Sequence, residues 1–161
     1  MSNLTQKAVF FDRDGTLTED PLPPGSLEDL KIVPDARKYL LTLKEKGYIL
    51  VMVTNQPDVK RGLLTREFID LTNEKICDTL PLDRVFVCPH SDEDKCECRK
   101  PKPGMLLQAA KELGIDLKKS IMVGDRKSDI DAGKAAGCRT VYVNHSQSLK
   151  DAVDWILEVS E

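Results

Sequence analysis

The sequence predicts a doubly wound α/β fold with a mainly parallel, five-stranded central sheet. Short apolar segments alternate with helical patterns along the whole chain, which implies right-handed crossovers between neighbouring parallel strands. Each of these segments is continuously apolar, as expected for strands that are covered by helices on both faces. The expected strands are residues 8–11, 49–53, 84–88, 121–123 and 140–143.

Five helices are expected between and after these strands. Thr65 can cap the second helix, and Gly47 and Gly114 can take the left-handed conformation that ends the first and third. Pro34 and Pro103 suit the opening turns of the first and third helices. The expected helices are about 34–46, 65–80, 103–113, 128–136 and 149–156.

Length and composition predict a single domain over residues 1–161, with 40% hydrophobic and 32% charged residues. No apolar run approaches the roughly 20 residues that cross a bilayer, and residues 1–6 do not resemble a signal peptide, so we expect a cytoplasmic protein without a membrane partner. The net charge of −3 argues against a general nucleic-acid binder. The connections at 15–33 and 89–102 are too short for a large cap domain, and the resulting open site suits a monomer.

Polar residues follow the predicted strands, where ligands bind in doubly wound sheets. Asp12 and Asp14 crowd two carboxylates together, which favours a bound divalent cation or a retained proton. Taken alone, this segment is equally compatible with a plain polar turn. Thr54, Lys100 and Asp125 add a hydroxyl, a cation and a further carboxylate at the same edge. The complete set favours chemistry on a phosphate group.

Residues 88–98 hold an unusual concentration of metal-binding side chains. Residues i and i+2 of an extended chain face the same way, so each of two pairs can chelate one ion. A disulfide framework does not fit a cytoplasmic protein, whereas three thiolates and one imidazole suit tetrahedral Zn²⁺. The predicted ligands are Cys88, His90, Cys96 and Cys98, and filling all four positions makes the zinc structural. Cys77 and Cys138 lie outside this set and are expected in the core.

Four motifs of the chain occur in the order found in one enzyme family. They are D-x-D-G-T at 12–16, Thr54, Lys100 before Pro101, and G-D-x-x-x-D at 124–129. The chain thereby resembles the haloacid dehalogenase-like (HAD) phosphatases. Thr54-Asn-Gln, Arg61-Gly, and the run C-R-K-P-K-P-G-M at 98–105 extend the likeness to the subgroup of D,D-heptose 1,7-bisphosphate phosphatase and histidinol-phosphate phosphatase. The resemblance covers about residues 8–143 and implies a Rossmann-like HAD fold.

The resemblance also implies a role for each motif residue. Asp12 would be the nucleophile that forms an aspartyl-phosphate, and Asp14 would be the acid/base partner. Mg²⁺ would be held by Asp12, Asp125 and the backbone carbonyl of Asp14. Thr54 and Lys100, rather than the nearby Lys102, would stabilise the phosphoryl group during transfer.

The rest of an anionic substrate would meet a second group of side chains. The candidates are Arg13, Asp20, Asn55, Gln56, Arg99 and Arg126. Arg126 can equally be a solvated charge at a helix end, and Asp129 can be either an acceptor behind the site or a helix-start residue. Residues 20–24 and 57–58 depart from the subgroup's His-Gly-Tyr-like and Ser-Gly segments. The added acidic side chains would repel a second phosphate.

The expected substrate is a small phosphorylated metabolite, with a sugar such as D-glycero-D-manno-heptose 1,7-bisphosphate as the first candidate. Histidinol phosphate and a 3′-phosphate at a DNA end are alternatives within the same chemistry. The alternative from another class is a receiver-type signalling domain, which keeps its phosphate instead of hydrolysing it. A receiver needs neither Asp14 as an acid nor a zinc loop, so the sequence favours the phosphatase.

Overall fold

The computed structural model describes residues 3–19 and 27–160, and it contains a five-stranded parallel sheet with strand order β3-β2-β1-β4-β5. The strands are β1 (Ala8–Phe11), β2 (Ile49–Asn55), β3 (Arg84–Cys88), β4 (Ile121–Gly124) and β5 (Arg139–Tyr142). This confirms the predicted doubly wound architecture. The sequence pattern missed the last two residues of β2, because Thr54 and Asn55 are polar yet still pair with Val87 and Cys88 of β3.

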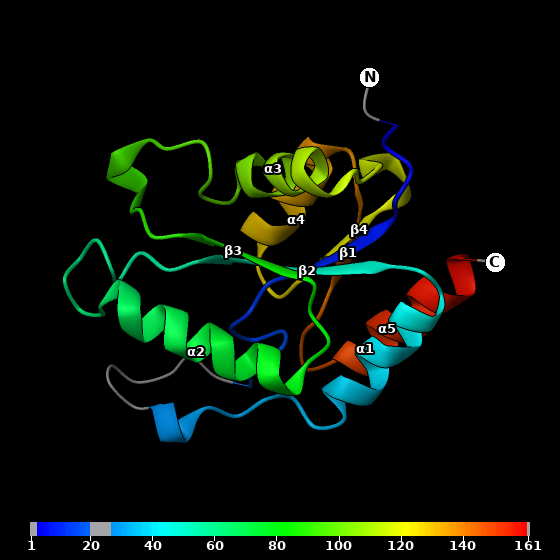
Figure 1. Ribbon diagram of the computed structural model, residues 1–161, viewed down its shortest axis with the longest axis horizontal. Coiled ribbons are helices and arrows are strands. Elements are labelled where there is room, and N and C mark those ends of the chain that lie inside the picture. Colours follow the sequence, from blue (N-terminus) through cyan, green and yellow to red (C-terminus); the bar gives the residue numbers. More distant parts are fainter. Residues whose placement is uncertain (1–2, 20–26, 161) are drawn as a thin grey trace.

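Helices cover both faces of the sheet (Figure 1). They are α1 (Ala36–Glu45), α2 (Arg66–Thr79), α3 (Gly104–Leu113), α4 (Lys127–Ala136) and α5 (Leu149–Val159), with 3-10 turns η1 (Leu27–Asp29), η2 (Asp92–Asp94) and η3 (Leu117–Lys119). Figure 1 shows α3 and α4 on one face and α1, α2 and α5 on the other. The two layers explain why the strands are apolar throughout.

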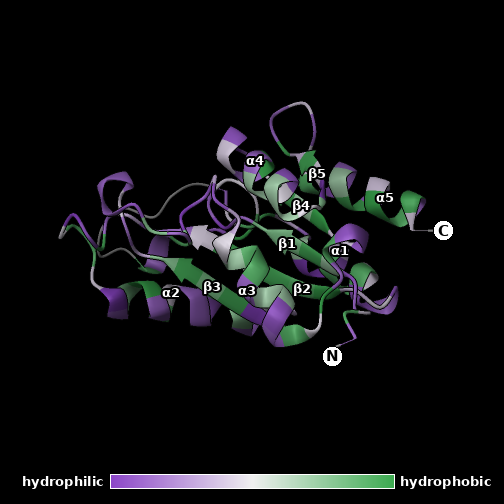
Figure 2. Ribbon diagram, turned by 90° about the horizontal axis from the view of Figure 1, so that it is seen from above, coloured by the Kyte–Doolittle hydropathy of each residue, from purple (hydrophilic) through white to green (hydrophobic). Residues whose placement is uncertain are grey.

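Successive residues of the central strand serve two separate cores. Val9 and Phe11 of β1 pack in the cluster that α1 and α5 complete, whereas Ala8 and Phe10 pack in the cluster that α3 completes. All four side chains are fully buried. Figure 2 accordingly shows mainly hydrophobic strands, with polar residues on the helices that flank them.

The helix ends follow the expected chemistry. The Thr65 hydroxyl accepts a hydrogen bond from the Phe68 amide at 3.0 Å and caps α2. Gly114 ends α3 with a φ of 68°, a left-handed conformation that costs glycine little. The expected burial is found for Cys138, whose pKa is raised to about 12 by desolvation. It is wrong for Cys77, which lies on the exposed side of α2 beside the buried Ile76.

The long connection after β1 folds back on itself where it is described. The Glu19 amide donates to the Lys31 carbonyl at 2.9 Å, and the Val33 amide donates to the Leu17 carbonyl at the same distance. Within residues 3–19 and 27–160, no insertion forms a large cap over the sheet. None of the helices in these ranges is long and apolar enough to cross a membrane.

Candidate active site

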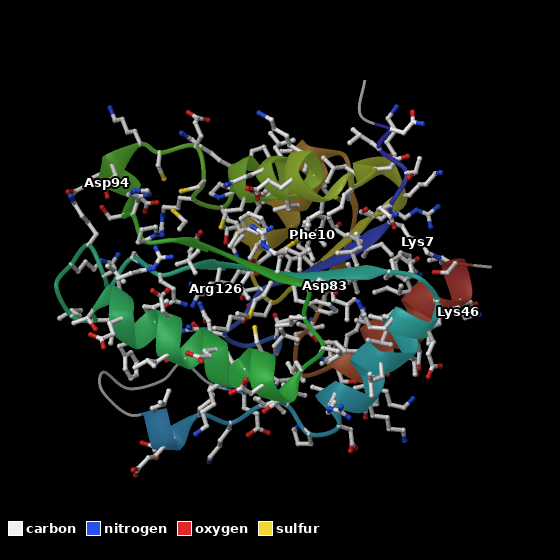
Figure 3. The ribbon with its side chains drawn as sticks, viewed as in Figure 1. Lys7, Phe10, Lys46, Asp83, Asp94 and Arg126 are labelled. Carbon is white, nitrogen blue, oxygen red and sulfur yellow. The ribbon has the colours of Figure 1, made fainter. Side chains whose placement is uncertain are left out.

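The predicted functional residues come from strands that are neighbours in the sheet. Asp12 follows β1 and Asp125 follows β4, and these two strands pair directly. Thr54 lies in β2, on the other side of β1. Because the chain leaves β1 toward β2 and later returns to β4, this edge is the point where strand order reverses. Figure 3 shows Arg126 on the same half of the molecule as Asp94, far from Lys7 and Lys46 at the opposite end of the sheet.

Lys100 is buried between two carboxylates. Its Nζ donates to Asp12 Oδ1 at 2.8 Å, to Asp129 Oδ1 at 2.7 Å and to the Val53 carbonyl at 2.9 Å. Burial disfavours the ammonium, but the charges of Asp12 and Asp129 outweigh that effect and raise the pKa of Lys100. The structure therefore presents a fixed, fully paired cation beside Asp12. Lys102 lies elsewhere, donating to the Cys96 carbonyl at 2.9 Å.

Three carboxylates converge beside this lysine. Asp12, Asp125 and Asp129 each offer an oxygen within 4.8 Å of the others. Burial, followed by the nearby Asp12, raises the pKa of Asp125 to about 7. Among the described residues, the buried Asp125 Oδ1 has no hydrogen-bond partner. Crowded carboxylate oxygens with an unsatisfied acceptor fit a hard divalent cation such as Mg²⁺.

Gly15 makes the close approach of Asp125 possible. A Cβ atom at this position would lie 2.1 Å from Asp125 Oδ2, far inside van der Waals contact. The residue also has a φ of 84°, which other residues rarely adopt. The D-x-D-G turn thus admits the carboxylate from β4 as well as reversing the chain.

The Asp14 side chain is held apart from the three converging carboxylates. Arg13 binds it in a bidentate pair, with Nε 3.0 Å from Oδ1 and Nη2 3.1 Å from Oδ2. Thr18 Oγ1 donates to Oδ1 at 3.3 Å, and Gln56 Nε2 donates to Oδ2 at 3.2 Å. Asp12 and Asp14 therefore meet different partners, although only one residue separates them in the chain.

The polar end of β2 supports both groups. Gln56 Nε2 donates to the buried Thr54 hydroxyl at 2.8 Å as well as to Asp14. Asn55 and the Lys100 backbone form a reciprocal pair, in which Asn55 Nδ2 donates to the Lys100 carbonyl and the Lys100 amide donates to Asn55 Oδ1, each at 3.1 Å. Asn55 therefore holds the lysine segment against the sheet.

An open pocket lies beside most of the site, although Thr54 and Asp125 are not among the described residues that line it. Its predicted members are Asp12, Arg13, Asp14, Asn55, Gln56, Lys100, Arg126 and Asp129. Other side chains at its wall were not singled out as substrate contacts: Pro57, Asp58, Arg61, Leu64, Phe68 and Ser128. Arg61 Nη1 donates to Asp58 Oδ1 at 3.2 Å, so the added acidic side chain of this segment carries its own counter-charge. The pocket thus combines acidic and basic groups around one opening.

Comparison with known proteins identifies the family. Residues 25–137 match the haloacid dehalogenase-like hydrolases. The chain belongs to the HAD family. It is 40% identical to the D-glycero-beta-D-manno-heptose-1,7-bisphosphate 7-phosphatase of Pasteurella multocida, over 95% of this chain and 92% of that one. The enzyme of the same name from Haemophilus influenzae is 43% identical, over 81% of this chain and 77% of that one.

Solved HAD structures share the fold. The crystal structure of D,D-heptose 1.7-bisphosphate phosphatase from B. bronchiseptica, complexed with magnesium and phosphate, matches with a TM-score of 0.83 and 25% identity. The match covers 96% of this chain and 99% of that chain. A putative HAD-like phosphatase from Mesorhizobium loti matches with the same TM-score and 26% identity. With its relatives named as phosphatases, this HAD protein is a phosphoric monoester hydrolase.

Residues 88–98 of this HAD phosphatase, here called the Cys–His loop, bring their cysteine and histidine side chains into a compact cluster. Cys88 Sγ lies 2.9 Å from Cys98 Sγ and 3.6 Å from Cys96 Sγ, and His90 Nδ1 lies 3.3 Å from Cys98 Sγ. The two sulfur–sulfur separations exceed the roughly 2.05 Å of a disulfide bond. Four soft donors around one point fit a tetrahedral metal ion, with Nδ1 as the imidazole ligand.

Two predicted substrate contacts are not part of the pocket that is described. Arg99 donates from Nε to Asp92 Oδ1 at 2.6 Å and from Nη1 to the His90 carbonyl at 3.3 Å, and it lines a separate hollow beside the Cys–His loop. Asp20 lies outside the described residues. Sequence reasoning missed Asn73, which accepts a hydrogen bond from Arg13 at 3.1 Å. No motif marks this residue, because it lies in the middle of α2.

Proposed function

We propose that this HAD phosphatase hydrolyses one phosphate of a sugar bisphosphate of the D-glycero-D-manno-heptose 1,7-bisphosphate type, through an aspartyl-phosphate on Asp12. The observation that carries the mechanism is the Lys100 ammonium, which lies 2.8 Å from Asp12 Oδ1 while Asp125 offers an oxygen to the same cluster. The names of the relatives support the choice of sugar.

In the first step, a carboxylate oxygen of Asp12 attacks phosphorus and the bond to the sugar oxygen breaks. Asp14 gives its proton to the departing alkoxide, and an acyl-phosphate remains on Asp12. In the second step, Asp14 takes a proton from water, which attacks the acyl-phosphate and releases inorganic phosphate. Asp12 and Asp14 are thereby restored to their starting states.

The remaining groups supply charge and position. Mg²⁺, held by Asp12, Asp125 and the Asp14 carbonyl, would neutralise charge on the phosphoryl oxygens. Lys100 and the Thr54 hydroxyl would bind the same group from the protein side. Asp129 would keep Lys100 in place, since its Oδ1 is 2.7 Å from the Lys100 Nζ and its Oδ2 accepts from the Arg126 amide at 3.1 Å.

The pocket wall supports a substrate with a second anionic group. Arg126 and Arg61 both line the opening, and the Asp58–Arg61 pair removes much of the repulsion expected from Asp58. Arg13, Asn55 and Gln56 would contribute mainly by holding the catalytic groups. Arg99 would reach a substrate only after leaving Asp92, and we retain it and Asp20 as proposed contacts.

We also propose that Cys88, His90, Cys96 and Cys98 hold a structural Zn²⁺. All four positions would be filled by protein, so the ion would order the loop that delivers Lys100 and would leave no site for a catalytic water. Asn55 links that loop to β2 through the Lys100 backbone. We propose further that residues 1–161 form one domain that acts as a cytoplasmic monomer on a small metabolite, with nucleic acid excluded as a general partner.

Steady-state hydrolysis tests the proposal directly. Heptose bisphosphate, histidinol phosphate and a 3′-phosphorylated oligonucleotide are offered with Mg²⁺ to the wild type, Asp12→Asn and Asp14→Asn. We expect multiple turnover, the highest kcat/KM on the heptose bisphosphate, and a loss of at least about 10³-fold in Asp12→Asn. Full activity of Asp12→Asn would refute the mechanism. One phosphate retained per chain without turnover would favour a receiver, and preference for another substrate would refute the choice of sugar.

A further inference from the structure

A buried arginine connects the acid/base residue to the middle of a helix. The Arg13 side chain is 3% exposed, and a charge so far from water requires partners for its N–H groups. Nε and Nη2 donate to the Asp14 carboxylate, and Nη1 donates to Asn73 Oδ1 at 3.1 Å. Hydrogen bonds at both ends of the guanidinium fix its plane, which in turn fixes the plane of the carboxylate it binds.

Asn73 is an unusual residue for its position. It lies on the inner side of α2, only 6% exposed, beside the fully buried Thr72 and near Ile76. An amide in a helix interior is unfavourable compared with leucine or alanine, and its burial costs free energy unless it is hydrogen-bonded. The bond to Arg13 spans 60 positions of sequence and supplies that partner. Packing of α2 against the sheet therefore sets where the Arg13 guanidinium lies.

We propose that Asn73 is a positioning residue for proton transfer: it fixes Arg13, and Arg13 orients the Asp14 carboxylate toward the leaving oxygen. This inference rests on the proposed role of Asp14. Proton transfer depends steeply on the position of the donor, and a displacement of about 1 Å can cost about 100-fold in rate. Without Asn73, Nη1 loses its acceptor, and the guanidinium turns to satisfy it.

The expected effect is partial, because Asp14 has other supports. Thr18 Oγ1 and Gln56 Nε2 also donate to its carboxylate, at 3.3 and 3.2 Å. Loss of the Asn73 contact should therefore disturb the orientation of Asp14 without releasing it. We expect about a tenfold loss, a fraction of the 10²–10⁴-fold that acid–base catalysis supplies.

The test compares leaving groups in Asn73→Leu, which keeps similar bulk and removes the acceptor. An alkyl phosphate needs a proton from Asp14 as its alkoxide departs, whereas p-nitrophenyl phosphate releases a stable phenolate that does not. We expect kcat/KM to fall about tenfold for the alkyl phosphate and less than about threefold for p-nitrophenyl phosphate. Since kcat/KM covers only the steps up to departure of the leaving group, the rate at which the phosphoenzyme is hydrolysed does not affect this comparison.

The matched control is Thr72→Val, the adjacent buried position, where the hydroxyl donates to the Phe68 carbonyl at 2.8 Å. It should leave the ratio of the two substrates unchanged. Adding Asn73→Leu to Arg13→Met should have no further effect on that ratio, because both changes act through the same guanidinium. Thermal unfolding of each variant checks folding, and Asn73→Ala replaces the leucine variant if that one does not fold.

Each outcome identifies which idea fails. An unchanged ratio in Asn73→Leu, or an equal fall for both substrates, would overturn the inference about Asn73. If Asp14→Asn itself hydrolysed the alkyl phosphate as well as the wild type does, the proposed role of Asp14 would fail first. A further loss in the double variant would show that Asn73 acts by another route.

Discussion

The substitution Lys100→Met tests the central charge arrangement most directly. Methionine keeps an unbranched chain in the buried space but removes the ammonium that contacts Asp12 and Asp129. Those carboxylates belong to residues that are only 7% and 1% exposed, so water cannot replace the lost cation. The substitution therefore leaves two neighbouring anions inside the protein.

The expected cost follows from the burial of this ion pair. Removing one partner of a buried pair costs about 3–5 kcal/mol, a large part of the roughly 5–15 kcal/mol that stabilises a typical domain. For a chain of this size, about 2–4 °C per kcal/mol corresponds to a fall in Tm of about 6–20 °C. Loss of charge at the phosphoryl group should lower kcat by about 10²–10³-fold.

The destabilisation should also depend on pH. Burial raises the pKa of Asp129, and Lys100 opposes that shift. The folded protein therefore holds the Asp129 proton more tightly than the unfolded chain does, and loss of the lysine strengthens this hold. Protonation then relieves the buried charge at low pH, so the deficit in Lys100→Met should be smaller at pH 5 than at pH 8.

Urea unfolding of the metal-free protein, followed by fluorescence of the single tryptophan, Trp155, measures these effects. Lys102→Met is the matched control, since this lysine is exposed and donates to the Cys96 carbonyl. In Lys100→Met/Asp129→Asn, the loss of stability should be smaller than the sum of the single losses by about 1–3 kcal/mol, while activity stays low. Additivity within about 0.5 kcal/mol, or wild-type stability of Lys100→Met, would refute the charge argument.

Three further predictions concern the metals and the turn beside them. Added Mg²⁺ should raise the Tm more at pH 8 than at pH 5.5, because Asp125, with a pKa raised to about 7, must lose its proton first; an equal shift at both values would contradict this. Gly15→Ala should weaken Mg²⁺ binding, measured by calorimetry, at least about tenfold, since the added Cβ would meet Asp125. The control is Gly62→Ala, where φ is 76° and the added Cβ would have no atom of the described residues within 4 Å. This variant should leave Mg²⁺ binding unchanged. Cys96→Ser should lose zinc by elemental analysis and lower both Tm and activity, whereas the exposed Cys77→Ser should retain all three.

Much of the fold could be predicted because each strand has one physical signature, an apolar run that must be buried on both faces. The signature fails where polar residues continue a strand. Thr54 and Asn55 are polar, yet backbone hydrogen bonds continue β2 through them to the site. The expected core position was wrong for Cys77, because a small apolar residue is equally compatible with the inner and outer sides of α2.

The candidate site could be predicted in its backbone positions and less well in its side-chain partners. The motifs report where strands end, so the proximity of Asp12, Lys100 and Asp125 could be expected from topology. Which cation meets which anion depends on burial and side-chain geometry. Lys100 is paired with Asp129 as closely as with Asp12. This ion pair gives Asp129, the last aspartate of the G-D-x-x-x-D motif, a structural role that the spacing of the motif alone did not reveal.

Side-chain geometry also gives the carboxylates of Asp12 and Asp14 different partners. The sequence predicted that the two carboxylates would bring their negative charges close together. The structure gives each carboxylate a different counter-charge, Lys100 for Asp12 and Arg13 for Asp14. The nucleophile and the acid/base have different tasks on the same phosphate. A separate counter-charge for each carboxylate allows both tasks within a segment of three residues. The helix position that completes the second pair, Asn73, has no motif because it acts through Arg13. Residues of this kind become visible only when the hydrogen bonds of a buried charge are followed outward from the site.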